Sequence, residues 1–144
     1  MDSMYDIMME LPLFKGVSRE RISEVVGNTK MHFLKYLAGE NIVQPAQACT
    51  HLKFIISGHV RSAIANSGNR FTVSQTLTAP DVIAPEFLFG RSTHYPCTAT
   101  AIDTVGILQI DKNDYIKILN SDRVFLYNFL NLLSMNAQKG VDGI

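Results

Sequence analysis

The stretch that decides the fold is residues 52–61, which reads LKFIISGHVR. Its first half has a period of two: Leu52, Phe54 and Ile56 alternate with Lys53 and Ile55. This alternation predicts a β-strand whose Leu52 side faces a core. Gly58 follows directly, and glycine accepts the positive φ that a tight turn between strands requires. We therefore expect a strand, a turn and a second strand that begins near residue 59.

Similar short strands are predicted on either side of this stretch. Between residues 29 and 110, apolar or alternating runs recur with turn residues between them; they are 31–36, 41–43, 52–56, 59–65, 70–77, 97–101 and 105–110. The sequence Asn-Ser-Gly-Asn at 66–69 indicates a hairpin loop. Several short strands at regular spacing predict an antiparallel sandwich, barrel or roll.

Helices are predicted on both sides of this strand-rich region. Ser18 is a favourable N-cap for a helix that ends near Gly27. After Asp111 the apolar residues return to the spacing of a helix. The predicted fold class is therefore α+β, with an antiparallel roll over about 29–110, N-terminal helices, and C-terminal helices over about 111–138.

The last helical segment, 124–137, is apolar nearly all the way round, so its side chains cannot all face one small core. Two interpretations remain open. Either the helix is buried wholly inside its own domain, or one face of it forms a subunit or domain interface.

Composition and charge exclude several classes of protein. The 144 residues carry 13 basic and 13 acidic side chains, so the formal net charge is zero, whereas a domain that grips nucleic acid usually has a basic excess. The apolar runs are far shorter than the ~18 residues of a membrane span. Residues 1–13 contain no basic residue, so a signal peptide is not expected. We expect a cytoplasmic protein that contacts no membrane.

Two cysteines, Cys49 and Cys97, lie far apart and outside any C-x-x-C motif. We expect reduced thiols, with a disulfide or a redox sensor as the alternative. Two cysteines are too few for an iron–sulfur cluster, and Cys49 with His51 is too small a ligand set for zinc. A haem needs only one histidine, but nothing singles one out among the four, which are His32, His51, His59 and His94. No metal or cofactor is assigned.

With these patterns in place, a family resemblance becomes visible. Residues 38–42 and 52–61 match the blocks G-E-x-I and L-x-F-I-x-S-G-x-V-R, a pair that resembles the cyclic-nucleotide-binding domain. More narrowly, the chain resembles the sensor domain of catabolite-activator-type (Crp/Fnr) bacterial transcription regulators. Residues 13–18 are similar to the opening L-F-x-G-L-S of that family, and 101–110 to its closing A-x-x-D and L-x-I blocks. The resemblance covers about 11–138 and implies a jelly-roll (double-stranded β-helix) architecture.

The resemblance also implies where a ligand would lie. The phosphate-binding cassette of the family reads roughly F-G-E, a short helix, then R-[ST]-A: backbone amides and the arginine receive the phosphate, and the glutamate accepts from the ribose hydroxyl. The corresponding stretch here departs from that pattern. Pro85, which has no N–H to donate, replaces the cassette glycine. Tyr95 falls at the arginine position, Arg91 lies about four positions earlier, and Glu86 is retained.

Two interpretations of the cassette follow. Either it binds no cyclic nucleotide and has become a different pocket or an inert scaffold, or a shifted loop lets Arg91 neutralise a phosphate. We favour the first, expecting neither cAMP nor cGMP to bind and leaving another small-molecule effector as the candidate. The candidate ligand-binding residues are Ala84, Pro85, Glu86, Phe87, Arg91, Tyr95, Pro96 and Cys97. No catalytic or metal-ligating residue is expected.

The resemblance further implies a homodimer and a second domain. In these regulators the long C-terminal helix pairs with its mate and connects the roll to a helix-turn-helix domain that binds DNA. The expected dimer-interface residues are Phe125, Leu126, Phe129, Leu130, Leu133 and Asn136. The chain ends at Ile144, so we expect the DNA-binding domain to be missing by truncation.

Two alternatives belong to other classes of protein. The first is a standalone cyclic-nucleotide-binding module that controls an enzyme or a channel. The second is an enzyme on a similar roll, such as a cupin. Cupins need a cluster of histidines with a carboxylate to hold a metal, and no H-x-H motif is present. We therefore expect no enzymatic activity.

Overall fold

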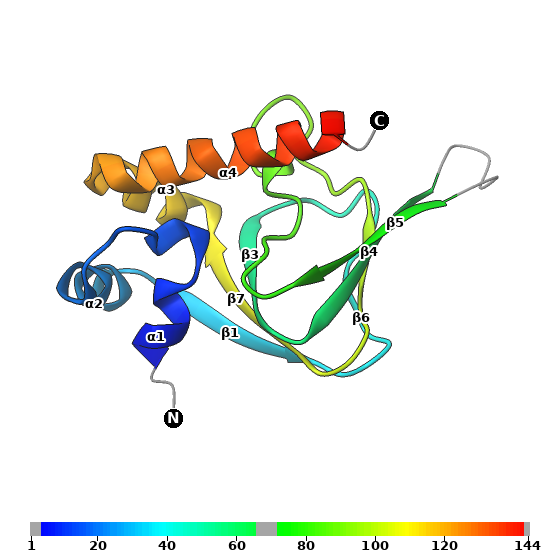
Figure 1. Cartoon of the computed structure of the whole chain (residues 1–144), viewed down its shortest axis with the longest axis horizontal. Helices are drawn as coiled ribbons and strands as arrows, with labels where there is room; N and C mark the ends of the chain where they lie inside the picture. The colour runs from blue at the N-terminus through cyan, green and yellow to red at the C-terminus, as the bar shows by residue number, and fades with distance from the viewer. Residues whose placement is uncertain (1–3, 66–71, 143–144) are drawn as a thin grey trace. The chain divides into compact units, whose positions relative to one another are not determined.

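The computed structural model describes residues 4–65 and 72–142 (Figure 1). The chain forms two compact units. One is helical and is built from both ends of the chain, up to Lys30 and from Asn113 onward; the other spans Met31–Lys112 and contains the strands. The hairpin loop predicted at 66–69 lies outside the described residues.

Two antiparallel sheets make up the strand unit. Their strands are β1 (Met31–Tyr36), β2 (Asn41–Val43), β3 (His51–Ser57), β4 (His59–Ala65), β5 (Thr72–Thr78), β6 (Thr98–Ala101) and β7 (Val105–Asp111). One sheet has the order β1-β7-β3 and the other β2-β6-β4-β5, and Figure 1 shows β4 and β5 side by side as a hairpin. With helices before and after the strands in the chain, this architecture confirms the predicted α+β antiparallel fold.

Strand β3 is paired along both of its edges. On one edge it pairs with β7 from His51 to Ser57. On the other edge the segment 81–83 runs antiparallel to it: the Ile55 N–H donates to the Asp81 carbonyl oxygen at 2.8 Å, and the Ile83 N–H donates to the Lys53 carbonyl oxygen at 3.0 Å. Lys53 and Ile55, at the middle of this strand, therefore have backbone hydrogen-bond partners on this second edge as well.

Both faces of β3 are buried as well, which corrects the sequence prediction. The alternation is right for Leu52 and Phe54 but wrong for Lys53 and Ile55, which are also buried. The neighbouring residues Ile107 and Leu108 of β7 point to opposite faces of the sheet, and each is 0% exposed. A sheet covered on both faces gives nearly continuous rather than alternating burial.

The turn from β3 to β4 depends on a glycine and on a distant aspartate. Gly58 has a φ of +85°, and a Cβ there would collide with the carbonyl oxygen of Thr104. The Asp103 carboxylate accepts from the backbone N–H of His59 at 2.8 Å and lies 2.7 Å from its ring Nδ1. These hydrogen bonds lower the pKa of Asp103. Asp103 thus holds the turn in place.

The helical unit comprises α1 (Met4–Met9), the short 3-10 helix η1 (Pro12–Phe14), α2 (Arg19–Asn28), α3 (Lys112–Ser121) and α4 (Arg123–Asp142). The predicted N-cap is confirmed, because the Ser18 hydroxyl accepts from the Arg21 N–H at 3.2 Å. Helix α2 continues to Asn28, one residue beyond the predicted end at Gly27. None of the helices in the described part of the chain is long and apolar enough to cross a bilayer.

Aromatic side chains join α4 to the rest of the helical unit. The Phe14 and Phe125 rings meet edge to face with centroids 6.1 Å apart, and Tyr115 and Phe129 do so at 5.2 Å. The Asn128 amide donates at 2.9 Å to the carbonyl oxygens of residues 13 and 15. One side of α4 is therefore occupied by residues of its own unit.

Replacing Gly58 with alanine tests the turn. An alanine there must adopt a positive φ and also displaces backbone, so we expect Gly58→Ala to lower the free energy of unfolding by roughly 3 kcal/mol in urea denaturation. The control is Gly39→Ala, where φ is +88° but nothing lies within 4 Å of the added Cβ. Its expected loss is about 1 kcal/mol. Equal losses for the two variants would contradict the close approach at Gly58.

Candidate functional site

The candidate site is the cassette, residues 81–97, which connects β5 to β6. It begins with a tight turn in which the Asp81 carboxylate accepts from the Thr78 N–H at 3.0 Å and the Asp81 N–H donates to the Thr78 carbonyl oxygen at 2.7 Å. Pairing of 81–83 with β3 then carries the chain to Ala84, which adopts a left-handed conformation with φ 43° and ψ 53°. The cassette is therefore anchored to the centre of the roll at its start.

Few backbone donors are available where the family receives a phosphate. Pro85 opens η2 (Pro85–Phe87), a 3-10 helix of three residues, and a proline has no N–H. The Phe87 N–H donates to the Ala84 carbonyl oxygen at 3.1 Å, and the Leu88 N–H to that of Pro85 at 3.3 Å. These two amides serve the helix itself, so η2 presents a poorer anion-binding terminus than a glycine-rich turn.

Of the three charged cassette residues, Glu86 and Arg91 are exposed and Asp81 is half-buried. Glu86 lies in η2; burial is the main cause that raises the pKa of the Cys97 thiol, and the negative charge of Glu86 adds to it. Arg91 is exposed and follows Gly90, whose φ is +95°. A phosphate ion pair is strongest where water is excluded, and Arg91 is not held in such a place.

Tyr95, which the family resemblance sets at the arginine position, is a core residue. Its side chain is 2% exposed, and burial raises the pKa of its phenol, so it is neutral. The Tyr95 backbone is fastened to the loop before β3: its N–H donates to the Gln47 carbonyl oxygen at 2.9 Å, and its carbonyl oxygen accepts from the Ala46 N–H at 3.0 Å. Residue 95 thus carries an uncharged side chain on a backbone that is fixed on both sides.

The two thiols lie near Tyr95. Cys49 and Cys97 are free and buried, and burial raises the pKa of each. The Cys49 Sγ donates to the His51 carbonyl oxygen at 3.8 Å, and the Tyr95 hydroxyl donates to the same oxygen at 3.4 Å. A raised pKa keeps both groups as neutral thiols near pH 7. Among the described residues, no three His, Cys, Asp or Glu side chains gather closely enough to hold a metal ion.

The eight predicted ligand-binding residues fall into three environments. Glu86 and Arg91 are exposed; Ala84, Phe87 and Pro96 are half-buried; Pro85, Tyr95 and Cys97 are buried. Neither of two surface hollows in the helical unit, about 110 and 490 Å³ in volume, is lined by any of them. The cassette is therefore mostly packed, and its exposed charged residues are Glu86 and Arg91.

Sequence reasoning missed one polar residue beside the cassette. Lys53 is 7% exposed and donates from Nζ to the Gln109 Oε1 at 2.5 Å. A lysine inside the otherwise apolar run 52–56 could have indicated a buried polar residue. The period of two, however, assigns it to the face of the strand that was expected to be exposed to solvent.

The predicted dimer residues also divide by exposure. Phe125 and Phe129 are buried within the helical unit, whereas Leu126 is 41% and Leu130 48% exposed. The other two, Leu133 and Asn136, are half-buried. Tyr127 and Met135 add further exposed apolar surface at 58% and 55%.

An antiparallel roll with a cassette between two of its strands is the architecture of a cyclic-nucleotide-binding-type domain. Comparison with family sequence models gives the same family. The chain belongs to the cyclic nucleotide-binding domain family, whose sequence model matches residues 33–122. The chain is 26% identical over 110 residues to the potassium channel GORK of Arabidopsis thaliana. That match covers 76% of this chain but only 13% of the length of the channel.

Solved structures share the same fold. The catabolite activator protein of Thermus thermophilus superposes with a TM-score of 0.75 and 18% identity, over 90% of this chain and 59% of that one. The sensor domain of the transcriptional regulator DNR from Pseudomonas aeruginosa has a TM-score of 0.74 and 16% identity, over 96% and 91% of the two chains. At such identities the likeness establishes the fold of the sensor domain and nothing finer.

Truncating Tyr95 and Arg91 tests whether the arginine position has become core. Removing a fully packed aromatic ring leaves a cavity, so we expect Tyr95→Ala to lower the free energy of unfolding by about 3–4 kcal/mol in urea denaturation. Arg91→Ala removes an exposed side chain and should change it by less than about 0.5 kcal/mol. A large loss for Arg91→Ala would show instead that this arginine is fixed within the site.

Proposed function

We propose that this chain is the ligand-sensing and dimerisation domain of a Crp/Fnr-type transcription regulator and that it responds to an effector other than cAMP or cGMP. The observation that carries the second part is the buried, neutral Tyr95 at the position of the phosphate-binding arginine. In this proposal the roll acts by binding a ligand and catalyses no reaction.

The altered cassette supports this choice of ligand class. A cyclic nucleotide brings one phosphate charge into the roll, and burying that charge is costly unless a cation and hydrogen-bond donors meet it. Pro85 withholds a backbone donor, Tyr95 supplies no charge, and Arg91 is exposed to solvent. Glu86 by itself offers a partner for a hydroxyl and none for a phosphate.

The surface of α4 supports a homodimer. Leu126 and Leu130 are one helical turn apart and both are largely exposed, and the half-buried Leu133 continues the same line. Large apolar side chains exposed in a row along a helix are typical of a helix that packs against a second helix. Phe125 and Phe129 support that surface from within their own unit rather than contacting the partner.

DNA binding would then belong to another domain. The chain has 13 basic and 13 acidic residues, so it lacks the charge that neutralises DNA phosphates. The likeness to a catabolite activator protein over 59% of that longer chain supports a regulator with a further domain.

A second candidate function is a regulatory module for a channel or an enzyme. The specific observation in its favour is the sequence match to a potassium channel over 76% of this chain. The two candidates differ in what the roll controls, and the coding sequence adjoining this chain would distinguish a DNA-reading domain from a pore or a catalytic domain.

Calorimetric titration with cAMP and with cGMP tests the proposed ligand class. We expect no saturable heat at ligand concentrations up to about 1 mM, because the cassette offers a buried phosphate no charged partner. Micromolar binding by the chain would contradict the proposal. If binding occurs and is lost in Arg91→Ala, the shifted-loop interpretation is correct.

Sedimentation equilibrium of charge variants tests the dimer. We expect Leu126→Glu combined with Leu130→Glu to weaken dimerisation at least about tenfold, since two carboxylates would be desolvated in the interface. The control is Asn131→Glu, an exposed residue of α4 that lies about 100° further round the helix axis than Leu130. A monomeric wild-type chain, or equal effects of the control, would contradict the proposed interface.

A further inference from the structure

The strand unit buries one charged side chain whose hydrogen-bond partner is neutral. Lys53 of β3 is the one charged residue that the described core buries, with 7% of its surface exposed. Its ammonium donates to the Gln109 side-chain oxygen, a neutral acceptor. An ammonium has three N–H donors, so this single hydrogen bond leaves donor capacity unused.

Lys53 forms no ion pair with a carboxylate among the described residues, 4–65 and 72–142. Burial lowers the pKa of Lys53, and the Cys49 sulfur opposes that effect only as a thiolate, whereas its own pKa is raised by burial. A buried cation without a partner is costly, and such groups are often completed by a ligand.

Cross-strand pairing places the Lys53 side chain on the same face of its sheet as Gln109. The Lys53 charge acts on the Cys49 thiol in the loop before β3. The Cys49 Sγ donates to the His51 carbonyl oxygen at 3.8 Å, and the hydroxyl of Tyr95 in the cassette donates to the same oxygen at 3.4 Å. Lys53 therefore lies near the loop to which the cassette is fastened.

The start of the cassette and two apolar side chains lie next to Lys53. The Lys53 carbonyl oxygen accepts from the Ile83 N–H, directly before the chain turns into η2. The strand register sets Gln109 opposite Lys53, and Ile107 opposite Ile55 two residues further on. Both isoleucines are 0% exposed, so the polar pair stands at the end of an apolar surface.

We propose that Lys53 and Gln109 form the polar end of an effector site inside the roll, and that this site takes a small organic monocarboxylate with an apolar body. The proposal rests on the proposed function and names the ligand class of its sensor. One buried positive charge balances one negative charge, which favours a carboxylate over a phosphate monoester dianion; a cyclic phosphodiester also carries a single charge, and the cAMP measurement below distinguishes it from a carboxylate. The Gln109 amide N–H₂ can donate to the second carboxylate oxygen. Because Ile55 and Ile107 have no exposed surface, the cassette must shift to admit the ligand.

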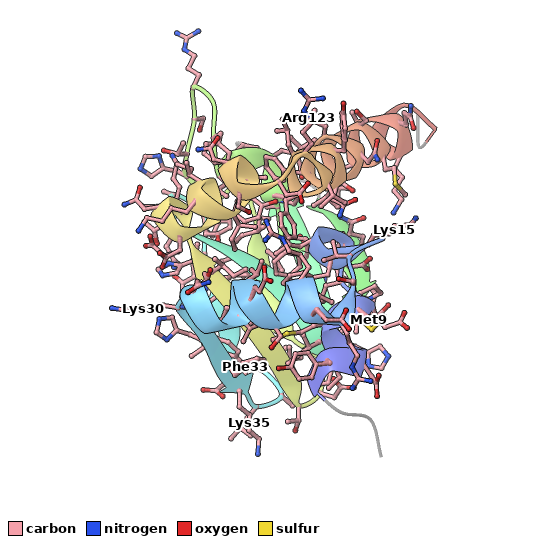
Figure 2. The ribbon with its side chains drawn as sticks, turned by 90° about the vertical axis from the view of Figure 1, so that its left-hand side faces the viewer. Met9, Lys15, Lys30, Phe33, Lys35 and Arg123 are labelled. Atoms are coloured by element: carbon pink, nitrogen blue, oxygen red, sulfur yellow. The ribbon has the colours of Figure 1, made fainter. Side chains whose placement is uncertain are left out.

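Thermal unfolding of the 144-residue chain with sodium acetate, hexanoate or benzoate tests the site, with sodium chloride at equal ionic strength as the reference. We expect hexanoate or benzoate at saturation to raise the Tm by roughly 5 °C, because a ligand that binds only the folded state stabilises it. Lys53→Met keeps the length of the side chain without its charge and should abolish the rise. Lys35→Met is the matched control: Lys35 is an exposed lysine of β1 that extends away from the sheet, and the rise should persist (Figure 2).

A second measurement covers the case in which Lys53→Met fails to fold. Reductive methylation with ¹³C-formaldehyde labels the lysines of the wild-type chain, and the Lys53 signal should shift on titration with hexanoate while the Lys35 signal stays. An equal rise in Tm for wild type and Lys53→Met, or no rise beyond chloride together with an unmoved Lys53 signal, would overturn the proposal.

The same assay with cAMP separates this inference from the proposed function. If a carboxylate binds through Lys53 and cAMP also raises the Tm, the proposed effector class is wrong while the Lys53 site stands. If cAMP raises the Tm and no carboxylate does, both proposals are overturned. If only the carboxylate acts and Lys53→Met removes its effect, both are supported.

Discussion

Hydrogen bonds along both edges of β3 hold the strand unit together. Strand β7 pairs with one edge, and the cassette segment 81–83 pairs with the other through the backbone of Lys53 and Ile55. Pairing on both edges encloses the middle of the strand, and residues 52–55 are buried, so both of its faces are covered there. The tight turn at Gly58 and its brace from Asp103 then carry the chain into the second sheet.

The same enclosure determines the chemistry of the candidate site. The cassette is tied to β3 at its start and to the loop before β3 at its end, where the Tyr95 backbone exchanges hydrogen bonds with Gln47 and Ala46. Tyr95, held in this way, packs as core and is neutral. The charged residue that the described part of the roll buries is Lys53, whose backbone carbonyl pairs with Ile83 at the start of the cassette.

Much of the architecture was predictable because it follows from local patterns. The period of two, the glycine turn and the Ser18 cap each depend on residues a few positions apart, and the family blocks supplied their order. The burial of Lys53 was not predictable, since alternation shows that a strand has two sides but not that both are covered. For α4, the all-round apolar pattern did not indicate that Phe125 would pack on Phe14.

The sequence by itself therefore determined the antiparallel roll between helices and the absence of an arginine at residues 95 and 96. Both are properties of residue order: which positions can pair, turn or carry a charge. Only the tertiary structure decided that Tyr95 is core, that Arg91 is exposed, and that Lys53 is a buried cation with a neutral partner. Burial and charge pairing depend on segments such as 81–83, which are distant from β3 in the chain but adjacent to it in space. A local sequence pattern does not show which distant segment will cover a residue.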